Sequence, residues 1–268
     1  MDDLLVRPLP TGMRDIFVSS FDRLLARRAL ARWRAAADRA GLADPATLRN
    51  LRSEARQLRR QIDRVLHAAE GRLACGGGIP AIPKPLLADW AWRPELWSGP
   101  VTPPGLAAVA SRTGFGNEVK VFHDCSESEL TLRQITTSRA TDPAPFGLSI
   151  EVFRFDGSFL SLALDLPPEG LRGLGGRHVM RLGMVLEAER PLEIFARLNL
   201  RHGPNTEQIV REVPKGATEA VVEFDLASTR LGDRGAEAAW LDLIFEGPQM
   251  NRIILRDLTF SRRPRAAL

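Results

Sequence analysis

Apolar and polar residues alternate along Leu192–Arg201, whose sequence is LEIFARLNLR, with Phe195 as the one aromatic residue in the polar set. Successive side chains of a β-strand point to opposite faces of the sheet, so this stretch predicts a strand with one face in the core. The stretch Trp240–Glu246, WLDLIFE, repeats the pattern. Both runs predict strands of an antiparallel sheet that has one packed face and one polar face.

Short runs of this kind, separated by turn residues, continue through the C-terminal part of the chain. They are Asn117–Asp124, Glu129–Ile135, Gly147–Phe155, Ser158–Leu166, His178–Glu187, Leu192–Arg201, Ala217–Leu226, Trp240–Glu246 and Asn251–Ser261. A tight turn is expected at Phe155–Ser158, and Glu246–Gln249 is expected to close a hairpin. Because no helix alternates with these runs, residues 106–261 predict an antiparallel β-sandwich, jelly-roll-like, in an α+β, mostly β chain.

Residues 20–73 predict an antiparallel helical hairpin. Ser19 or Ser20 can cap the first helix, and Gly41 is expected to end it in the left-handed conformation. Asp44 followed by Pro45 is the start signal of the second helix.

Apolar residues recur in the second helix at alternating spacings of three and four, as in a coiled-coil seam. They are Leu48, Leu51, Ala55, Leu58, Ile62, Val65 and Ala69, and the first helix offers a matching stripe at Phe21, Leu24, Leu25, Trp33, Ala36, Ala37 and Ala40. Because one hairpin buries little surface, we expect it to dock on the rest of the chain or to pair with a second copy in a homo-oligomer.

Residues 74–105 contain seven Pro and five Gly, which predicts that no regular element persists there. The same segment contains Trp90, Trp92 and Trp97, so it is expected to wrap over the sandwich and bury those rings. Residues 1–19 and 262–268 are predicted to be an N-terminal tail and a short basic tail.

Composition excludes several classes of protein. The chain has 268 residues, of which 44% are hydrophobic and 26% charged, as in a globular protein. No run approaches the ~18 apolar residues of a membrane span, no secretory signal is visible, and two cysteines make no disulfide framework. These features predict a cytoplasmic protein without a transmembrane segment.

The formal net charge of +4 is concentrated in residues 21–73, where thirteen Arg face six Asp and Glu. Because acidic residues are interspersed with these arginines and no reader motif accompanies them, we expect no nucleic-acid partner.

The outward face of the predicted sheet carries the candidate ligand-binding residues. Arg197, Asn199 and Arg201 lie on one strand and Trp240 on another, a combination that suits a sugar because a ring stacks on it while polar groups bond its hydroxyls. The following loop, Arg201–Gln208, adds three more candidates, His202, Asn205 and Glu207, although its Gly-Pro-Asn core is also typical of an ordinary turn, which is the favoured interpretation. A solvated sheet face, or one covered by the N-terminal segments, would show the same pattern.

No catalytic or metal site is predicted, and no cofactor. Three consecutive residues, His123–Cys125, point in alternating directions and cannot form a triad. Cys75 and Cys125 with scattered histidines lack zinc-ligand spacing. Asp242 and Glu246 lie ~13 Å apart on one strand face, too far for a glycosidase pair.

Long segments of the chain resemble a protein family of Rhodobacter-type alphaproteobacteria that has a domain-of-unknown-function label. They are SFDRLLARRALARWR (20–34), DWAWRPELW (89–97), FRFDGSFLSLALDLP (153–167), EIFARLNLRHGPNTEQ (193–208) and WLDLIFEGPQMNRIILRDLTFSRRPRA (240–266). The resemblance implies a bacterial cytoplasmic protein and transfers no catalytic residues. The last two strands also loosely resemble the closing hairpin of jelly-roll carbohydrate-binding modules, a likeness of fold alone.

Three functions remain open on this evidence. The first is a non-enzymatic module that binds a glycan or another polar ligand, with the helices mediating assembly or docking to a protein partner. The second is a scaffolding protein without a small ligand, and the third, ranked last, is a glycan-modifying enzyme.

Overall fold

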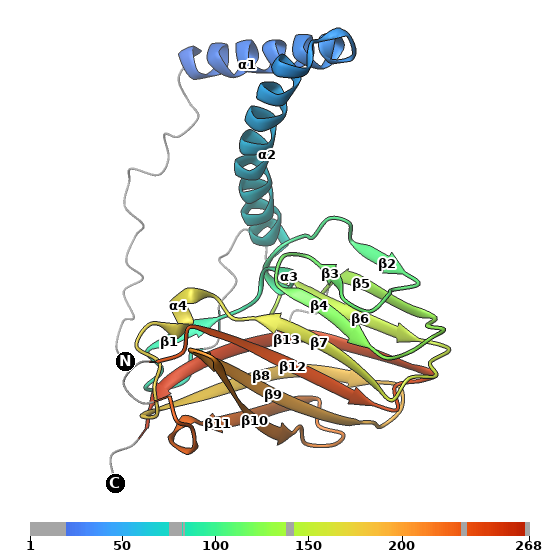
Figure 1. The fold of residues 1–268 in the computed structure, drawn as a ribbon, viewed down its shortest axis with the longest axis vertical. Helices are drawn as coiled ribbons and strands as arrows, with labels where there is room; N and C mark the ends of the chain where they lie inside the picture. The colour runs from blue at the N-terminus through green and yellow to red at the C-terminus, as the bar shows by residue number, and fades with distance from the viewer. Residues whose placement is uncertain (1–19, 75–81, 83, 138–141, 232–234, 266–268) are drawn as a thin grey trace, which may run out of the picture. The chain divides into compact units, whose positions relative to one another are not determined.

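The structure is a computed structural model and describes residues 20–74, 82, 84–137, 142–231 and 235–265 (Figure 1). The chain divides into two compact units, Met1–Asp63 and Arg64–Leu268. The described part of the first unit is helical, and the second contains the strands.

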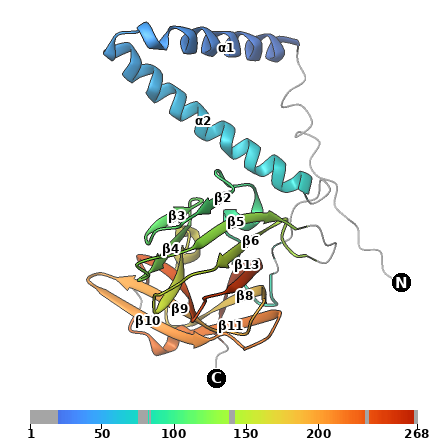
Figure 2. The same cartoon turned by 90° about the vertical axis from the view of Figure 1, so that its right-hand side faces the viewer.

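Two helices follow the predicted signals. Helix α1 spans Ser20–Arg39, a 3₁₀ turn η2 spans Ala40–Leu42, and α2 spans Pro45–Ala74 (Figure 2). Asp44 caps α2 as predicted, because its Oδ1 accepts hydrogen bonds from the amides of Ala46 and Thr47 at 2.9 and 3.0 Å. The expectation for Gly41 is wrong: it lies inside η2 and is not among the glycines with positive φ, so α1 tightens into a 3₁₀ turn instead.

The apolar stripes of the two helices do not bury each other. Leu24 and Leu25 of α1 are exposed, and Leu58, Ile62 and Val65 of α2 are 41%, 48% and 65% exposed. An exposed ion pair, Arg32 with Glu54, joins the helices. The expected packing of one stripe against the other is therefore not found, and the seam of α2 faces outward.

Eight strands form a jelly roll (Figure 1). They are β6 (Phe146–Val152), β7 (Phe159–Asp165), β8 (His178–Ala188), β9 (Glu193–His202), β10 (Asn205–Glu212), β11 (Glu219–Asp225), β12 (Ala238–Glu246) and β13 (Asn251–Pro264). Sheet A has the order β11-β8-β13-β6, and sheet B has the order β10-β9-β12-β7, with all pairs antiparallel. This sandwich confirms the predicted fold class.

Shorter elements extend both sheets. Sheet A continues from β6 through β5 (Leu130–Thr136) to β2 (Gly105–Ala107), and β1 (Trp90–Trp92) pairs with β13. Sheet B continues through β4 (Val119–His123) to β3 (Thr113–Phe115). Short helices α3 (Glu95–Ser98), α4 (Pro168–Leu171) and η3 (Leu226–Ser228) complete the described elements.

Each of the nine predicted runs contains a strand, and their aliphatic faces form the core. On β9, for example, Ile194, Ala196, Leu198 and Leu200 are buried, as the alternation predicts. Three of the four strands that the sequence missed (β1, β2 and β3) have three residues each, and the fourth, β10, is polar apart from Ile209 and Val210.

Three details of the predicted boundaries differ in the structure. Glu246–Gln249 does not close a hairpin, because β12 belongs to sheet B and β13 to sheet A. The predicted linker contains regular elements, β1 and α3. The predicted basic tail begins inside β13, where Arg262 forms a two-bond ion pair with Asp89 at 2.9 and 3.1 Å.

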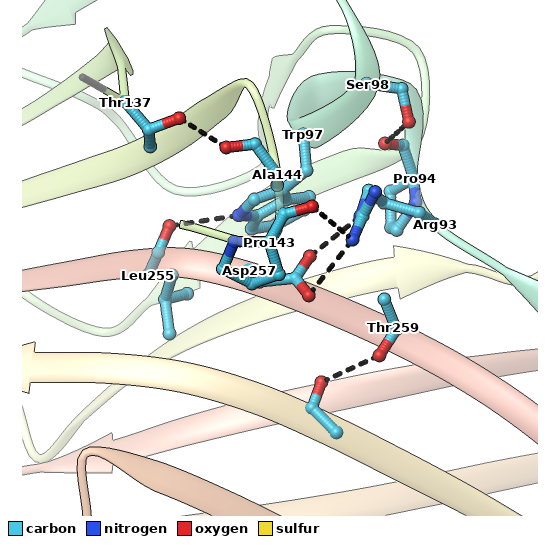
Figure 3. A network of polar contacts seen from close by, with 11 residues as sticks. Arg93, Pro94, Trp97, Ser98, Thr137, Pro143, Ala144, Leu255, Asp257 and Thr259 are labelled. Carbon is cyan, nitrogen blue, oxygen red and sulfur yellow. Dashed lines mark hydrogen bonds and ion pairs between the residues drawn. The ribbon is translucent and has the colours of Figure 1, made fainter. Parts of the chain in front are cut away.

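The segment before the sandwich is built into sheet A at an irregularity of β13 (Figure 3). The register of β13 on β8 shifts between Leu255 and Asp257, a β-bulge. Arg93 Nε donates to Asp257 Oδ1 at 2.8 Å, and Arg93 Nη2 donates to Asp257 Oδ2 at 3.2 Å and to the Pro143 carbonyl at 2.9 Å. Trp97 Nε1 donates to the Leu255 carbonyl at 3.0 Å. All of these side chains are buried except that of Pro143, which is half-buried.

Replacing Arg93 by Ala is expected to lower the free energy of unfolding by about 3–5 kcal/mol, because it leaves the Asp257 carboxylate buried without its ion pair. Urea titration followed by circular dichroism measures this. Arg133→Ala is the matched control, since it removes an exposed pair with Glu151 on β5 of the same sheet and should cost no more than about 1 kcal/mol. Equal losses in the two variants would contradict a structural role for the buried pair.

Candidate functional site

The outer face of sheet B brings four of the predicted residues together. Arg197 of β9 lies opposite Asp242 of β12, and Asn199 lies opposite Trp240. Directly opposite residues of an antiparallel pair share a face. Arg201 continues the same face at the end of β9 and is exposed. The predicted cluster of Arg197, Asn199, Arg201 and Trp240 is therefore contiguous.

Hydrogen bonds link the polar side chains of this face into one network. Arg197 Nε and Nη2 donate to Asp242 Oδ2 at 3.0 and 2.8 Å, and Asn199 Nδ2 donates to the same oxygen at 2.9 Å. Gln208 of β10 donates from Nε2 to Asn199 Oδ1 at 3.0 Å. Asn199 is 1% exposed and Asp242 is 7% exposed, so both are held rigidly, while the side chain of Arg197 is 36% exposed. We call these four side chains the sheet B network.

Aromatic rings flank the sheet B network on both sides along the strands. Trp240 and Phe195 share its face and are half-buried. Phe195 lies opposite Ile244, which lies opposite Ser161 of β7. The outer face of sheet B thus offers a rigid polar centre between two rings.

The three residues predicted from the loop lie elsewhere. Residues 201–208 are not a loop: β9 and β10 form a hairpin around Gly203, whose φ is +54°, so Glu207 sits on β10. Asn205 pairs with His202 and Glu207 with Leu200, which places them on the side of the sheet opposite Arg197. His202 Nε2 lies 3.1 Å from Glu207 Oε1 across the hairpin, and the Glu207 carboxylate also accepts from the Arg230 amide, which follows η3.

Two members of the sheet B network were missing from the predicted site. The alternation of Trp240–Glu246 puts Asp242 on the outward face, but no pattern in the sequence shows that Asp242 lies opposite Arg197. The position of Gln208 could be predicted from a two-residue hairpin turn at Gly203–Pro204, because that turn fixes the register in which Gln208 lies opposite Asn199. The glycine and proline at that turn were the available signal.

A groove of about 400 Å³ crosses the outer face of sheet A, and no sequence pattern indicated it. Gly183 of β8 lies in it, and an added Cβ there would lie 3.1 Å from Thr259 Oγ1. Arg256 donates to both oxygens of Glu187 at 2.7 and 2.9 Å at one end, and Arg181 lines the groove as well. The groove depends on the strand order β11-β8-β13, which local sequence does not encode.

The three residues of the cluster His123–Cys125 bond to different partners, and Cys125 is half-buried. His123 Nε2 lies 2.9 Å from the Val109 carbonyl, and Asp124 accepts from the Ser158 amide at 2.8 Å. The Cys125 thiol donates to Asp156, and hydrogen bonds from it and from Ser126 hold the pKa of Asp156 well below its usual range.

Within the described ranges, no group of three His, Cys, Asp or Glu side chains converges on a metal site. Among the helices the structure describes, none combines the length and the apolar character needed to cross a membrane.

A model for a family of unknown function (DUF6478) matches residues 13–268. The chain belongs to this family. The match covers nearly the whole DUF6478 chain and confirms the resemblance to a domain-of-unknown-function family. No curated protein matches it.

Solved structures similar to the DUF6478 chain include carbohydrate-binding modules. A family 61 module in complex with β-1,4-galactotriose is 15% identical, with a TM-score of 0.33, and the match covers 55% of this chain and 88% of that one. A xylan-binding domain from Paenibacillus barcinonensis is 13% identical, with a TM-score of 0.36, over 70% and 99%. The enzymatically active domain of tailspike protein 4 from bacteriophage CBA120 is 13% identical, with a TM-score of 0.39, over 57% of this chain and 21% of that chain.

The carboxyl group of Glu118 lies just before β4, which runs between β7 and β3 in sheet B. Glu118 Oε2 accepts from the Glu95 amide at 2.6 Å, and Glu95 Oε2 accepts from Asn117 Nδ2 at 2.7 Å. Burial raises the pKa of Glu118 to about 7; the amide of Glu95 opposes the rise, and the Glu95 carboxylate adds to it. This carboxyl group accepts a hydrogen bond from the amide of the first residue of α3.

The raised pKa predicts a pH-dependent stability. The folded state holds this proton more tightly than the unfolded chain, so the contribution of Glu118 is complete below the ordinary pKa of 4.5 and is lost as pH rises through about 7. Glu118→Gln should flatten the melting temperature of the protein between pH ~4.5 and ~7.5 relative to wild type. Glu246→Gln, at the exposed end of β12, is the control, and a wild-type slope in Glu118→Gln would contradict the assignment.

Proposed function

We propose that the sandwich is a non-enzymatic module that binds a carbohydrate on the outer face of sheet B. The observation that carries this proposal is the sheet B network of Arg197, Asp242, Asn199 and Gln208, set between the rings of Phe195 and Trp240. Carbohydrate sites combine a ring that stacks on the sugar with rigid groups that donate and accept hydrogen bonds.

Free hydrogen-bonding atoms remain at the surface of the network. Within the described residues, no hydrogen bond uses Asp242 Oδ1 or Arg197 Nη1, so a sugar hydroxyl can donate to the carboxylate and accept from the guanidinium. The bonds that Asn199 and Gln208 already make hold the network in one arrangement. Little side-chain entropy is then lost on binding, which favours affinity.

A binding role suits this face better than catalysis. Asp242 is tied to Arg197 and Asn199, while Glu246 lies at the exposed end of β12, opposite Glu193. Four residues along a strand separate their positions by ~13 Å, beyond the carboxylate spacing of either glycosidase mechanism. Asp242 and Glu246 are therefore too far apart to act together as a general acid and a general base or nucleophile.

A glycan-array screen of the full chain tests the proposal, and isothermal titration with the best oligosaccharide then measures affinity. The full chain is used because a fragment beginning at residue 106 lacks Arg93 and Trp97, which are built into sheet A. Replacing Trp240 by Ala should weaken binding by about 10- to 100-fold, as expected for a central aromatic contact. Arg197→Ala should also weaken binding.

Arg181→Ala in the groove of sheet A is the matched control and should leave affinity unchanged. Loss of binding in Arg181→Ala, with Trp240→Ala unaffected, would move the site to sheet A. Absence of binding to any glycan by folded protein would refute the carbohydrate proposal.

A further inference from the structure

Helix α2 exposes a continuous apolar stripe at coiled-coil spacing. Leu48, Leu58, Ile62 and Val65 occupy alternating a and d positions of a heptad and are 39%, 41%, 48% and 65% exposed. A soluble protein does not usually leave such a stripe uncovered, so it marks an interaction surface. None of the described residues of α1 buries it.

The stripe also avoids the positions at which the C-terminal turns of α2 contact the segment before the sandwich. His67 Nδ1 lies 3.4 Å from the Pro100 carbonyl, and a Cβ on Gly71 would meet the Ser98 carbonyl oxygen at 2.2 Å. Residues 67 and 71 lie at neither a nor d positions, and at 3.6 residues per turn they fall on the far side of the helix from the stripe. A partner helix can therefore run along the seam without displacing these contacts.

We infer that the stripe pairs with the α2 of a second copy in a parallel, two-stranded coiled coil. Two of the three d positions are leucine, Leu51 and Leu58, and the a position Ile62 is β-branched, a combination that favours two parallel strands. The other a and d positions are apolar: Leu48, Ala55, Val65 and Ala69. The seam extends over three heptads of one uninterrupted helix. Most arginines of α2 lie at positions b, c and f, outside the seam, where they remain solvated.

Charges beside the seam favour the parallel orientation. Glu54 occupies a g position, and Arg59 occupies the e position five residues later, so a parallel pair in register places each Glu54 against Arg59 of the second copy. An antiparallel pair brings e positions together and sets Arg52 against Arg59, a repulsive arrangement. The exposed Arg32–Glu54 pair within one chain contributes little and does not prevent the exchange.

A parallel pair places both C-terminal ends of α2 at the same end of the coiled coil. The two sandwiches that follow can then engage one multivalent ligand, and linked binding of this kind raises avidity by orders of magnitude. This consequence depends on the proposed carbohydrate function, whereas the dimer itself does not.

Sedimentation equilibrium of the full chain, without carbohydrate, tests the inference. Wild type should have twice the chain mass of 29.6 kDa, and Ile62→Asp should have the chain mass with unchanged strand content by circular dichroism. Gln57→Asp, which lies outside the seam, is the matched control and should remain dimeric. The inference would be overturned if wild type had the mass of one chain over the whole concentration range, or if Ile62→Asp remained a dimer. Binding of the stripe to anionic vesicles would not rescue it.

A charge-reversal series tests the orientation in the same instrument. Arg59→Glu should weaken the parallel dimer by about tenfold, because two attractions become two repulsions. Adding Glu54→Arg to it should restore the wild-type dissociation constant. A tighter dimer for Arg59→Glu alone would contradict the parallel arrangement, because it would relieve the Arg52–Arg59 repulsion of an antiparallel pair.

Discussion

The buried ion pair between Arg93 and Asp257 joins the segment before the sandwich to strand β13 of sheet A. A buried carboxylate is costly, and burial raises the pKa of Asp257 although Arg93 opposes the rise. Asp257, the residue that contacts Arg93, lies at the bulge of β13. Beyond the bulge, β13 pairs with β1. The same segment is held at two further points: Trp97 donates to the Leu255 carbonyl, and the first residue of α3 donates its amide to Glu118. The segment before the sandwich is therefore a structural part of sheet A (Figure 3).

The jelly roll leaves its two outer faces with different characters. Sheet B has a hydrogen-bonded polar network between two aromatic rings, while sheet A has a groove that Gly183 lines. A preformed network costs little entropy when a ligand binds, which is why the network carries the functional proposal. The exposed seam of α2 supplies a separate surface, and coupling the two would turn a weak monovalent binder into a strong bivalent one.

Local patterns in the sequence predict the strands and the sandwich. They do not predict strand register or pairs of side chains far apart in the chain, because contacts between distant residues determine both. The period-two alternation of Leu192–Arg201 correctly places Arg197 and Asn199 on the outer face. His202 and Glu207 were misplaced because the strand continues through a two-residue turn, and register decides which face each residue takes. Arg93 and Asp257 lie 164 positions apart, and no local pattern can pair them.

Nuclear magnetic resonance of the indole N–H groups can show whether a sugar binds on the outer face of sheet B. The chain has five tryptophans, and the Nε1–H of Trp97 is buried and bonded to the Leu255 carbonyl, which makes it an internal reference. On titration with an oligosaccharide that the protein binds, we expect the Trp240 indole resonance to shift until the site is saturated while that of Trp97 stays in place. Saturable binding that leaves the Trp240 resonance unmoved would contradict a carbohydrate site on sheet B.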